Sequence, residues 1–169
     1  MAVQIQSEYS VNGSIESLIG GRMENQDSAG FKDVELGCLV VVCDGMGGGN
    51  GGSTASRLAV QTVIDDMSLT KDYHDPIEKL SDAIKHANEV IFSTGKADPS
   101  LYGMGTTLTA ILISKQSAII AHVGDSRVYQ LRNKNKVFRT KDHSMVFQFV
   151  QQGLISEEEL GIKIKDEKT

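Results

Sequence analysis

The sequence lacks several features that would place it in a specialised class of protein. It has only two prolines among 169 residues, and it contains no internal repeat, low-complexity tract or proline-rich linker. No apolar run is long enough to span a bilayer, and the first residues show neither the basic region nor the apolar stretch of a signal peptide. We therefore expect one soluble domain over residues 1–169.

Basic clusters are also missing, and cysteine is scarce. The net charge of −5 argues against a nucleic-acid or membrane surface as partner. The two cysteines, Cys38 and Cys43, lie five apart in one strand pattern, so they point to opposite faces and cannot pair with each other. Reduced core thiols of this kind are typical of the cytosol, and we expect a cytoplasmic protein.

The most informative stretch begins at Cys38. The apolar run of residues 38–43 does not alternate with polar residues, which predicts a strand buried on both faces. Asp44 follows this run and would lie at the rim of the sheet, where an unpaired carboxylate is costly. Six glycines occur among the next eight residues. A metal ion would satisfy Asp44, with the Gly45 carbonyl as a further ligand. A helix N-cap aspartate followed by a tight turn is the simpler alternative.

The remaining chain predicts a mixture of strands and helices. Helices are expected from Ser53 and after the Asp75-Pro76 cap. Strand patterns cover residues 2–11, 28–36, 105–114, 117–123 and 127–131. The series of hairpins indicates an antiparallel sheet, and with the two helices it favours an α+β layered fold.

Further polar residues could share a site with Asp44. The strand pattern of residues 117–123 ends at Gly124-Asp125, so a second carboxylate reaches a sheet rim, although a hairpin turn also explains this pair. Two such carboxylates favour a hard cation such as Mg²⁺ or Mn²⁺. Arg22 and Asp27 precede the central strand and are either members of the site or ordinary surface residues.

Five short motifs follow one another along the chain. They are Arg22-Met23-Glu24-Asn25-Gln26-Asp27, Val42-Cys43-Asp44-Gly45-Met46-Gly47-Gly48, Gly105-Thr106-Thr107, Val123-Gly124-Asp125-Ser126-Arg127 and Asp142-His143-Ser144. In order and spacing they resemble the metal-dependent Ser/Thr protein phosphatases, the PPM or type 2C class, in their bacterial form. The resemblance implies a four-layer α-β-β-α sandwich of two antiparallel sheets flanked by helices, incomplete at the C-terminus because the last third of such a domain would follow.

The resemblance also implies a role for each candidate residue. Asp44 would bridge two Mn²⁺ or Mg²⁺ ions, the Gly45 carbonyl would bind one of them, and Asp27 would be a direct or water-mediated ligand. Asp125 would serve a weaker third metal. Arg22 would clamp the phosphate of a phosphorylated protein, which suits a forked guanidinium. Water made acidic by two cations would then attack phosphorus without a covalent phosphoenzyme.

The sequence departs from the family pattern in three places. Met46 stands where many eukaryotic relatives carry a histidine, and Gly49 replaces a histidine common in bacterial members. The capping box Ser156-Glu157-Glu158-Glu159 predicts a helix near the end of the chain. The third departure is that the last third of the family's domain, which would follow, is missing from this sequence. In the family that part contributes two further aspartates that complete the metal site. We therefore expect this polypeptide alone to have weak or no activity, and its unpaired strands to permit self-association.

Two other functions are compatible with the same motifs. One is a non-catalytic phosphatase-like scaffold or regulator, which need not bind a metal. The other is a nucleotide-binding module, because Gly47-x-Gly49-x-x-Gly52 lies between a strand and a helix. Against the second, Asp44 would repel a pyrophosphate, and no clear second strand follows the helix that begins at Ser53.

Overall fold

A five-stranded antiparallel sheet is the centre of the computed structural model, which describes residues 2–47, 51–69 and 75–143. Its strands are β3 (Asp27–Val34), β4 (Gly37–Met46), β5 (Gly105–Thr106), β6 (Leu108–Ile113) and β7 (Ala118–Val123). The order is β3-β4-β6-β7, with β5 paired to the end of β4. β4 therefore pairs with β3 on one side, and on the other with β6 and then, at its end, with β5.

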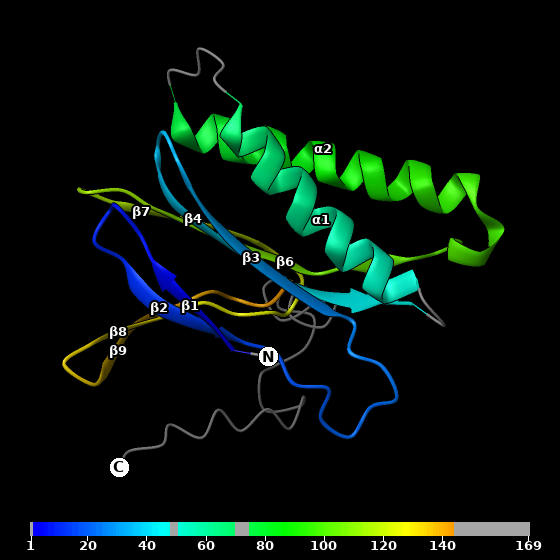
Figure 1. Ribbon diagram of the computed structural model, residues 1–169, viewed down its shortest axis with the longest axis horizontal. Coiled ribbons are helices and arrows are strands. Elements are labelled where there is room, and N and C mark those ends of the chain that lie inside the picture. Colours follow the sequence, from blue (N-terminus) through cyan, green and yellow to red (C-terminus); the bar gives the residue numbers. More distant parts are fainter. Residues whose placement is uncertain (1, 48–50, 70–74, 144–169) are drawn as a thin grey trace, which may run out of the picture.

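Two helices cover one side of this sheet, and two hairpins lie on its other side (Figure 1). The helices are α1 (Gly51–Ser68) and α2 (Pro76–Ala97), and a short 3₁₀ turn, η1 (Pro99–Leu101), follows α2. The hairpins are β1 (Ala2–Gln6) with β2 (Asn12–Glu16), and β8 (Tyr129–Arg132) with β9 (Asn135–Arg139). This arrangement confirms the expected α+β fold with antiparallel sheets and helices. A second outer helical layer is not present among the described residues.

The core lies between the sheet and the helices. Leu39, Val41 and Cys43 alternate along β4 and are fully buried beneath α1 and α2. The other face of β4 is closed only in part, because Val42 is 42% exposed although Cys38 is buried. The expectation of burial on both faces therefore holds for the first half of the strand and is wrong for the second half, which opens toward solvent next to Asp44.

The expected opening strand over residues 2–11 is instead a hairpin with a turn at Ser7 to Val11. Backbone hydrogen bonds from Ser7 to Val11 and from Ser10 to Ser7 close this turn. The Tyr9 hydroxyl lies 2.8 Å from the carbonyl oxygen of Val34, and the Ser7 hydroxyl donates to Asp33 at 2.6 Å. Ser7 and Tyr9 thus attach the hairpin to the segment where β3 turns into β4. Their alternation of polar and apolar side chains reflects these contacts and not the two faces of a strand.

Both helix predictions are confirmed, although α1 begins at Gly51 rather than at Ser53. Asp75 caps α2 by accepting a hydrogen bond from the backbone N–H of Ile77 at 2.8 Å. Leu80 and Ala87 of α2 pack in the core, whereas Ile77 in its first turn is 61% exposed.

Strand pairing decides against the nucleotide-binding alternative. Every strand pair among the described residues is antiparallel, and α1 leads into α2 rather than into a parallel strand. A dinucleotide fold requires parallel strands joined by a helix, so the described strands do not form the fold on which this alternative depends. In the part of the chain that the structure describes, no helix has both the length and the apolar character needed to cross a bilayer.

Candidate active site

Two carboxylates face each other where β3 and β4 meet. Asp27 and Asp44 are direct partners in the antiparallel register, and both side chains are exposed. Like charges directly opposite each other destabilise a strand pair. Partial desolvation raises the pKa of Asp44, the nearby carboxylates of Asp27 and Asp125 raise it further, and the Arg22 guanidinium acts in the opposite direction. The strand ends therefore carry excess negative charge that a cation would offset.

A cleft of about 850 Å³ opens over this pair. It brings together four of the five expected site residues, namely Arg22, Asp27, Asp44 and Gly45. Asp125 does not line the cleft, although its charge reaches Asp44. No cluster of three or more acidic, histidine or cysteine side chains suited to a metal occurs within the described residues. The site therefore offers one close carboxylate pair, with Asp125 at its periphery.

The backbone of Asp44 is fixed by the Gly105-Thr106-Thr107 motif. The N–H of Asp44 donates to the Thr107 hydroxyl at 2.9 Å, and its carbonyl accepts from the Thr107 N–H at 2.8 Å and from the Thr106 hydroxyl at 2.9 Å. The Thr107 hydroxyl also contacts that of Ser126 at 2.7 Å. The expected strand over residues 105–114 is broken at Thr107 because this residue turns its hydrogen bonds to Asp44.

Glycine at position 45 is required by a close approach of backbones. A Cβ atom built on Gly45 would lie 2.1 Å from the carbonyl oxygen of Gly52 and 2.6 Å from that of Gln26. The end of β4, the start of α1 and the loop before β3 thus meet with no room for a side chain. The left-handed freedom expected of the glycine loop is used at Gly47, whose φ is 144°.

Ser56 and Gln26 hold the same junction, and the sequence analysis assigned no role to either. The buried hydroxyl of Ser56 donates to the Gln26 carbonyl at 2.6 Å, which also accepts from the N–H of Gly45 at 3.2 Å. The available signal was a serine among the small and apolar residues that α1 presents to the sheet. A buried polar side chain at such a position requires a hydrogen-bond partner.

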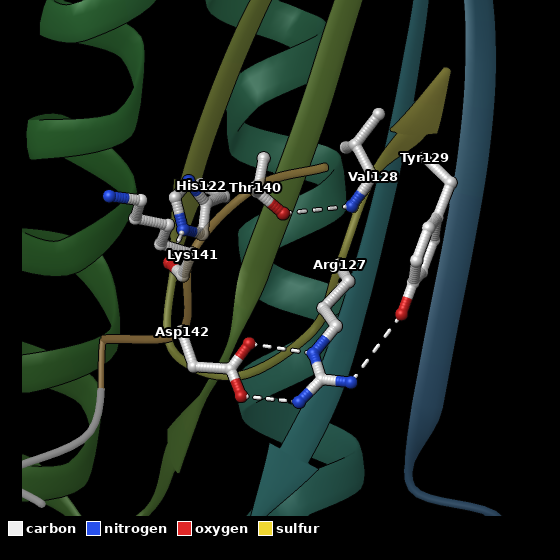
Figure 2. Close-up of polar contacts among 7 residues, drawn as sticks. All are labelled: His122, Arg127, Val128, Tyr129, Thr140, Lys141 and Asp142. Atoms are coloured by element: carbon white, nitrogen blue, oxygen red, sulfur yellow. Dashed lines mark hydrogen bonds and ion pairs between the residues drawn. The ribbon is translucent and has the colours of Figure 1, made fainter. Parts of the chain in front are cut away.

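Arg127 and Asp142 join two of the five motifs (Figure 2). Two nitrogens of the Arg127 guanidinium bind the two carboxylate oxygens of Asp142, one of them at 2.6 Å. This ion pair lowers the pKa of Asp142. Beside it, Thr140 accepts a hydrogen bond from the N–H of Val128 at 3.0 Å through its side chain. The ion pair therefore holds the segment after β9 against the segment before β8, and we assign it a role in stability.

Cys43 is excluded as a nucleophile. Its side chain is fully buried on the face of β4 opposite Asp44, and burial raises the pKa of the thiol to about 12. A cysteine phosphatase needs an accessible thiolate. Any phosphoryl transfer in the cleft would therefore have to use another nucleophile.

Comparison with known proteins identifies the family. Residues 16–153 match the family model described as protein phosphatase 2C. The chain belongs to this family. It is 37% identical over 142 residues to the serine/threonine phosphatase stp of Listeria welshimeri, which covers 82% of this chain and 56% of that protein. The serine/threonine protein phosphatase PstP of Mycobacterium tuberculosis shows the same identity over 142 residues, covering 82% of this chain and 26% of PstP.

Solved structures of bacterial serine/threonine phosphatases share the fold. The crystal structure of Mycobacterium tuberculosis PstP has a TM-score of 0.67 at 32% identity and covers 94% of this chain and 60% of that chain. Stp1 from Staphylococcus aureus gives 0.73 at 27% identity, covering 97% and 61% respectively. The catalytic domain of PstP, solved in complex with two manganese ions, gives 0.66 at 32% identity. The resemblance based on five motifs is confirmed, and the chain spans little more than half the length of its Listeria relative.

The carboxylate pair in the cleft suits a divalent cation in the type of ligand that it offers. Asp27 and Asp44 supply carboxylate oxygens, which Mg²⁺ and Mn²⁺ prefer. Two carboxylates are fewer than the oxygens that such an ion binds, so water or other residues must supply the remainder. Other expectations lie outside the described residues: the effect of Gly49, the position of Ser144, and the helix predicted from the capping box at residues 156–159.

The threonine clamp on Asp44 predicts a difference between two similar substitutions. Thr107→Val should lower the free energy of unfolding by about 1–3 kcal/mol, because it leaves the part-buried N–H of Asp44 without its acceptor. Thr109→Val is the matched control, since its buried hydroxyl has no hydrogen-bond partner among the described residues. It should be neutral or stabilising in urea denaturation. Equal losses in both variants would contradict the role of Thr107.

The Arg127–Asp142 pair predicts a dependence of stability on pH. Because the pKa of Asp142 is lowered in the folded protein, its stabilisation is present above the ordinary aspartate pKa and is lost as the pH falls through the lowered value. Asp142→Asn should therefore cost about 1 kcal/mol at neutral pH, a small value because Arg127 is 40% exposed. The difference from the wild type should shrink below about pH 4. Denaturation at pH 3 and pH 7 measures this, and an unchanged difference would exclude the ion pair as its source.

Proposed function

We propose that this chain contributes the metal-binding and phosphate-binding part of a Ser/Thr protein phosphatase, which hydrolyses phosphoserine and phosphothreonine in proteins. The observation that carries this proposal is the meeting of a cationic side chain, Arg22, with the Asp27–Asp44 pair in one cleft. Its relatives are named serine/threonine phosphatases, and one was solved with two manganese ions, which supports the assignment.

In this proposal each residue of the cleft has a distinct role. Asp44, Asp27 and the Gly45 carbonyl hold Mn²⁺ or Mg²⁺, while Asp125, outside the cleft lining, serves a weaker third site. Bound cations supply positive charge that acidifies a water molecule and offsets the charge of the phosphoryl oxygens. Arg22 binds the phosphate through its forked guanidinium. With Cys43 buried, water attacks phosphorus directly, the bond from phosphorus to the serine or threonine oxygen breaks, and that oxygen leaves as the alcohol after taking up a proton.

The substrate binds where Arg22 can reach it. Arg22 is exposed in the loop before β3 and lines the cleft, so its guanidinium is open to a phosphate that enters from solvent. Its charge already acts on Asp44. A phosphate placed between Arg22 and a cation at the carboxylate pair would be held from both sides, which fixes its orientation for attack.

The polypeptide of 169 residues, taken as one domain, should be a weak phosphatase or an inactive one. Glu24, Asp27 and Asp44 line the cleft, but the described residues hold no group of three acidic, histidine or cysteine side chains suited to a metal ion, so the ligand set for two ions is small. The same observation favours the second candidate function, a phosphatase-like scaffold or regulator. Metal binding separates the two, because a scaffold has no need of Mn²⁺.

We expect the wild-type chain to bind Mn²⁺ weakly but saturably in isothermal titration calorimetry. Asp44→Asn should weaken binding by at least about tenfold, because it removes one charged ligand of a small set. Asp65→Asn is the matched control, since Asp65 is exposed on α1 and does not line the cleft. It should bind as the wild type does.

Two results would change this assignment. Absence of Mn²⁺ binding in the wild type would favour the scaffold. Steady hydrolysis of a phosphothreonine peptide by the 169-residue chain, abolished by Asp44→Asn, would contradict the expected weak activity and show a functional site.

We also propose that the chain acts in the cytoplasm on phosphorylated proteins and that it associates with itself through unpaired strands. The β8–β9 hairpin is a sheet of two strands, and it exposes Leu131, Val137 and Phe138. Exposed edges with apolar side chains favour pairing with another chain.

Light scattering after size-exclusion chromatography tests the association. We expect a dimer at high concentration that Phe138→Glu converts to a monomer, because a charge on the hairpin opposes pairing. A wild-type monomer at every concentration would exclude self-association.

A further inference from the structure

The loop that carries Arg22 also carries exposed apolar side chains. Leu18, Ile19 and Met23 lie in this loop, and Met46 lies at the end of β4. Each of the four is at least half exposed, and all four line the cleft that contains Arg22 and the carboxylate pair. We call these four residues the apolar rim.

Exposed apolar residues that are scattered singly need no explanation. The apolar rim differs, because its members gather in one concave site beside a cation and two carboxylates. The cleft lining mixes these apolar side chains with charged and amide side chains, and in ligand sites apolar side chains provide contact area while a few polar groups fix orientation. The rim residues are therefore available to contact whatever enters the cleft.

A tight turn sets the distance between the apolar rim and Arg22. The N–H of Arg22 donates to the carbonyl of Ile19 at 3.3 Å, and Gly20 within this turn has a φ of 59°. The ends of such a turn lie within about 7 Å of each other. An extended peptide advances about 3.3 Å per residue. A peptide whose phosphate meets Arg22 thus places its neighbours, up to about two residues away, against Ile19 and the adjoining rim.

We propose that the apolar rim selects phosphoprotein segments that have an aliphatic or aromatic side chain within about two residues of the phosphorylated one. This inference rests on the proposed function, in which Arg22 binds the phosphate. Glu24 also lines the cleft, so an acidic neighbour in the segment would meet a like charge. The rim therefore favours apolar neighbours over acidic ones.

Two fluorescein-labelled phosphothreonine peptides test the proposal in the presence of Mn²⁺. One peptide has leucine and the other has glutamine at both of the nearest positions on each side of the phosphothreonine. The two peptides are otherwise identical. By fluorescence anisotropy, the 169-residue chain should bind the leucine peptide about fivefold to tenfold more tightly, as expected from partial burial of an aliphatic side chain.

Substitutions in the rim should remove this preference. Ile19→Ser and Met23→Ser should each reduce it to about twofold or less, because they replace an apolar contact by a hydroxyl. Ile77→Ser is the matched control: Ile77 is exposed in the first turn of α2 and does not line the cleft. It should keep the full preference. Circular dichroism of each variant checks that the fold is unchanged.

The outcomes separate this inference from the proposed function. Equal binding of both phosphopeptides, lost in Arg22→Ala and absent for unphosphorylated peptides, would overturn the role of the rim and leave the phosphate site intact. A preference that Ile77→Ser reduces as much as Ile19→Ser would also overturn it. If neither phosphopeptide binds through Arg22, both proposals are overturned.

Discussion

The repulsion between Asp27 and Asp44 is the constraint on which the rest of the site depends. Their opposition follows from the β3–β4 register, and a shift of one residue would turn every side chain of β4 to the other face. The buried alternation of Leu39, Val41 and Cys43 against the helices prevents that shift. The hydrophobic core therefore fixes a pair of like charges that is unfavourable by itself, and this is the arrangement that a cation site requires.

Such a pair persists only if the backbone around it cannot relax. Three elements converge on the end of β4: Thr107 from the β5–β6 junction, Gly52 from the start of α1, and Gln26 from the loop before β3. The part-buried hydrogen bond between Thr107 and Asp44 is costly to break, because breaking it leaves a polar group without its partner. The five motifs thus serve two purposes. Some residues line the cleft, and others, including Arg127 and Asp142, hold the surrounding segments in place.

Local patterns predicted the elements whose stability is local. The cap at Asp75 predicted the start of α2, and the apolar run predicted β4. Both features are visible in a few consecutive residues, because a cap and a buried strand each require particular residue types at adjacent positions. Tyr9 and Thr107 were read incorrectly as strand residues, since their positions depend on partners 25 and 63 residues away. For the site, the resemblance to the family predicted five residues together, and four of them line the same cleft. The peripheral place of Asp125 could not be read from its motif.

The residues of the cleft come from two kinds of element, a rigid sheet and a loop. Asp27 and Asp44 are fixed by strand pairing, whereas Arg22 and most of the apolar rim lie on the loop before β3. Asn25 joins the two parts, because its side chain accepts a hydrogen bond from the N–H of Asp27 at 3.0 Å and donates to Ser17 at 2.7 Å. Loops vary more readily than the elements that support them. Changes at Ile19 or Met23 could therefore alter which phosphoprotein segment is selected while the charge pair, held by the core, stays as it is.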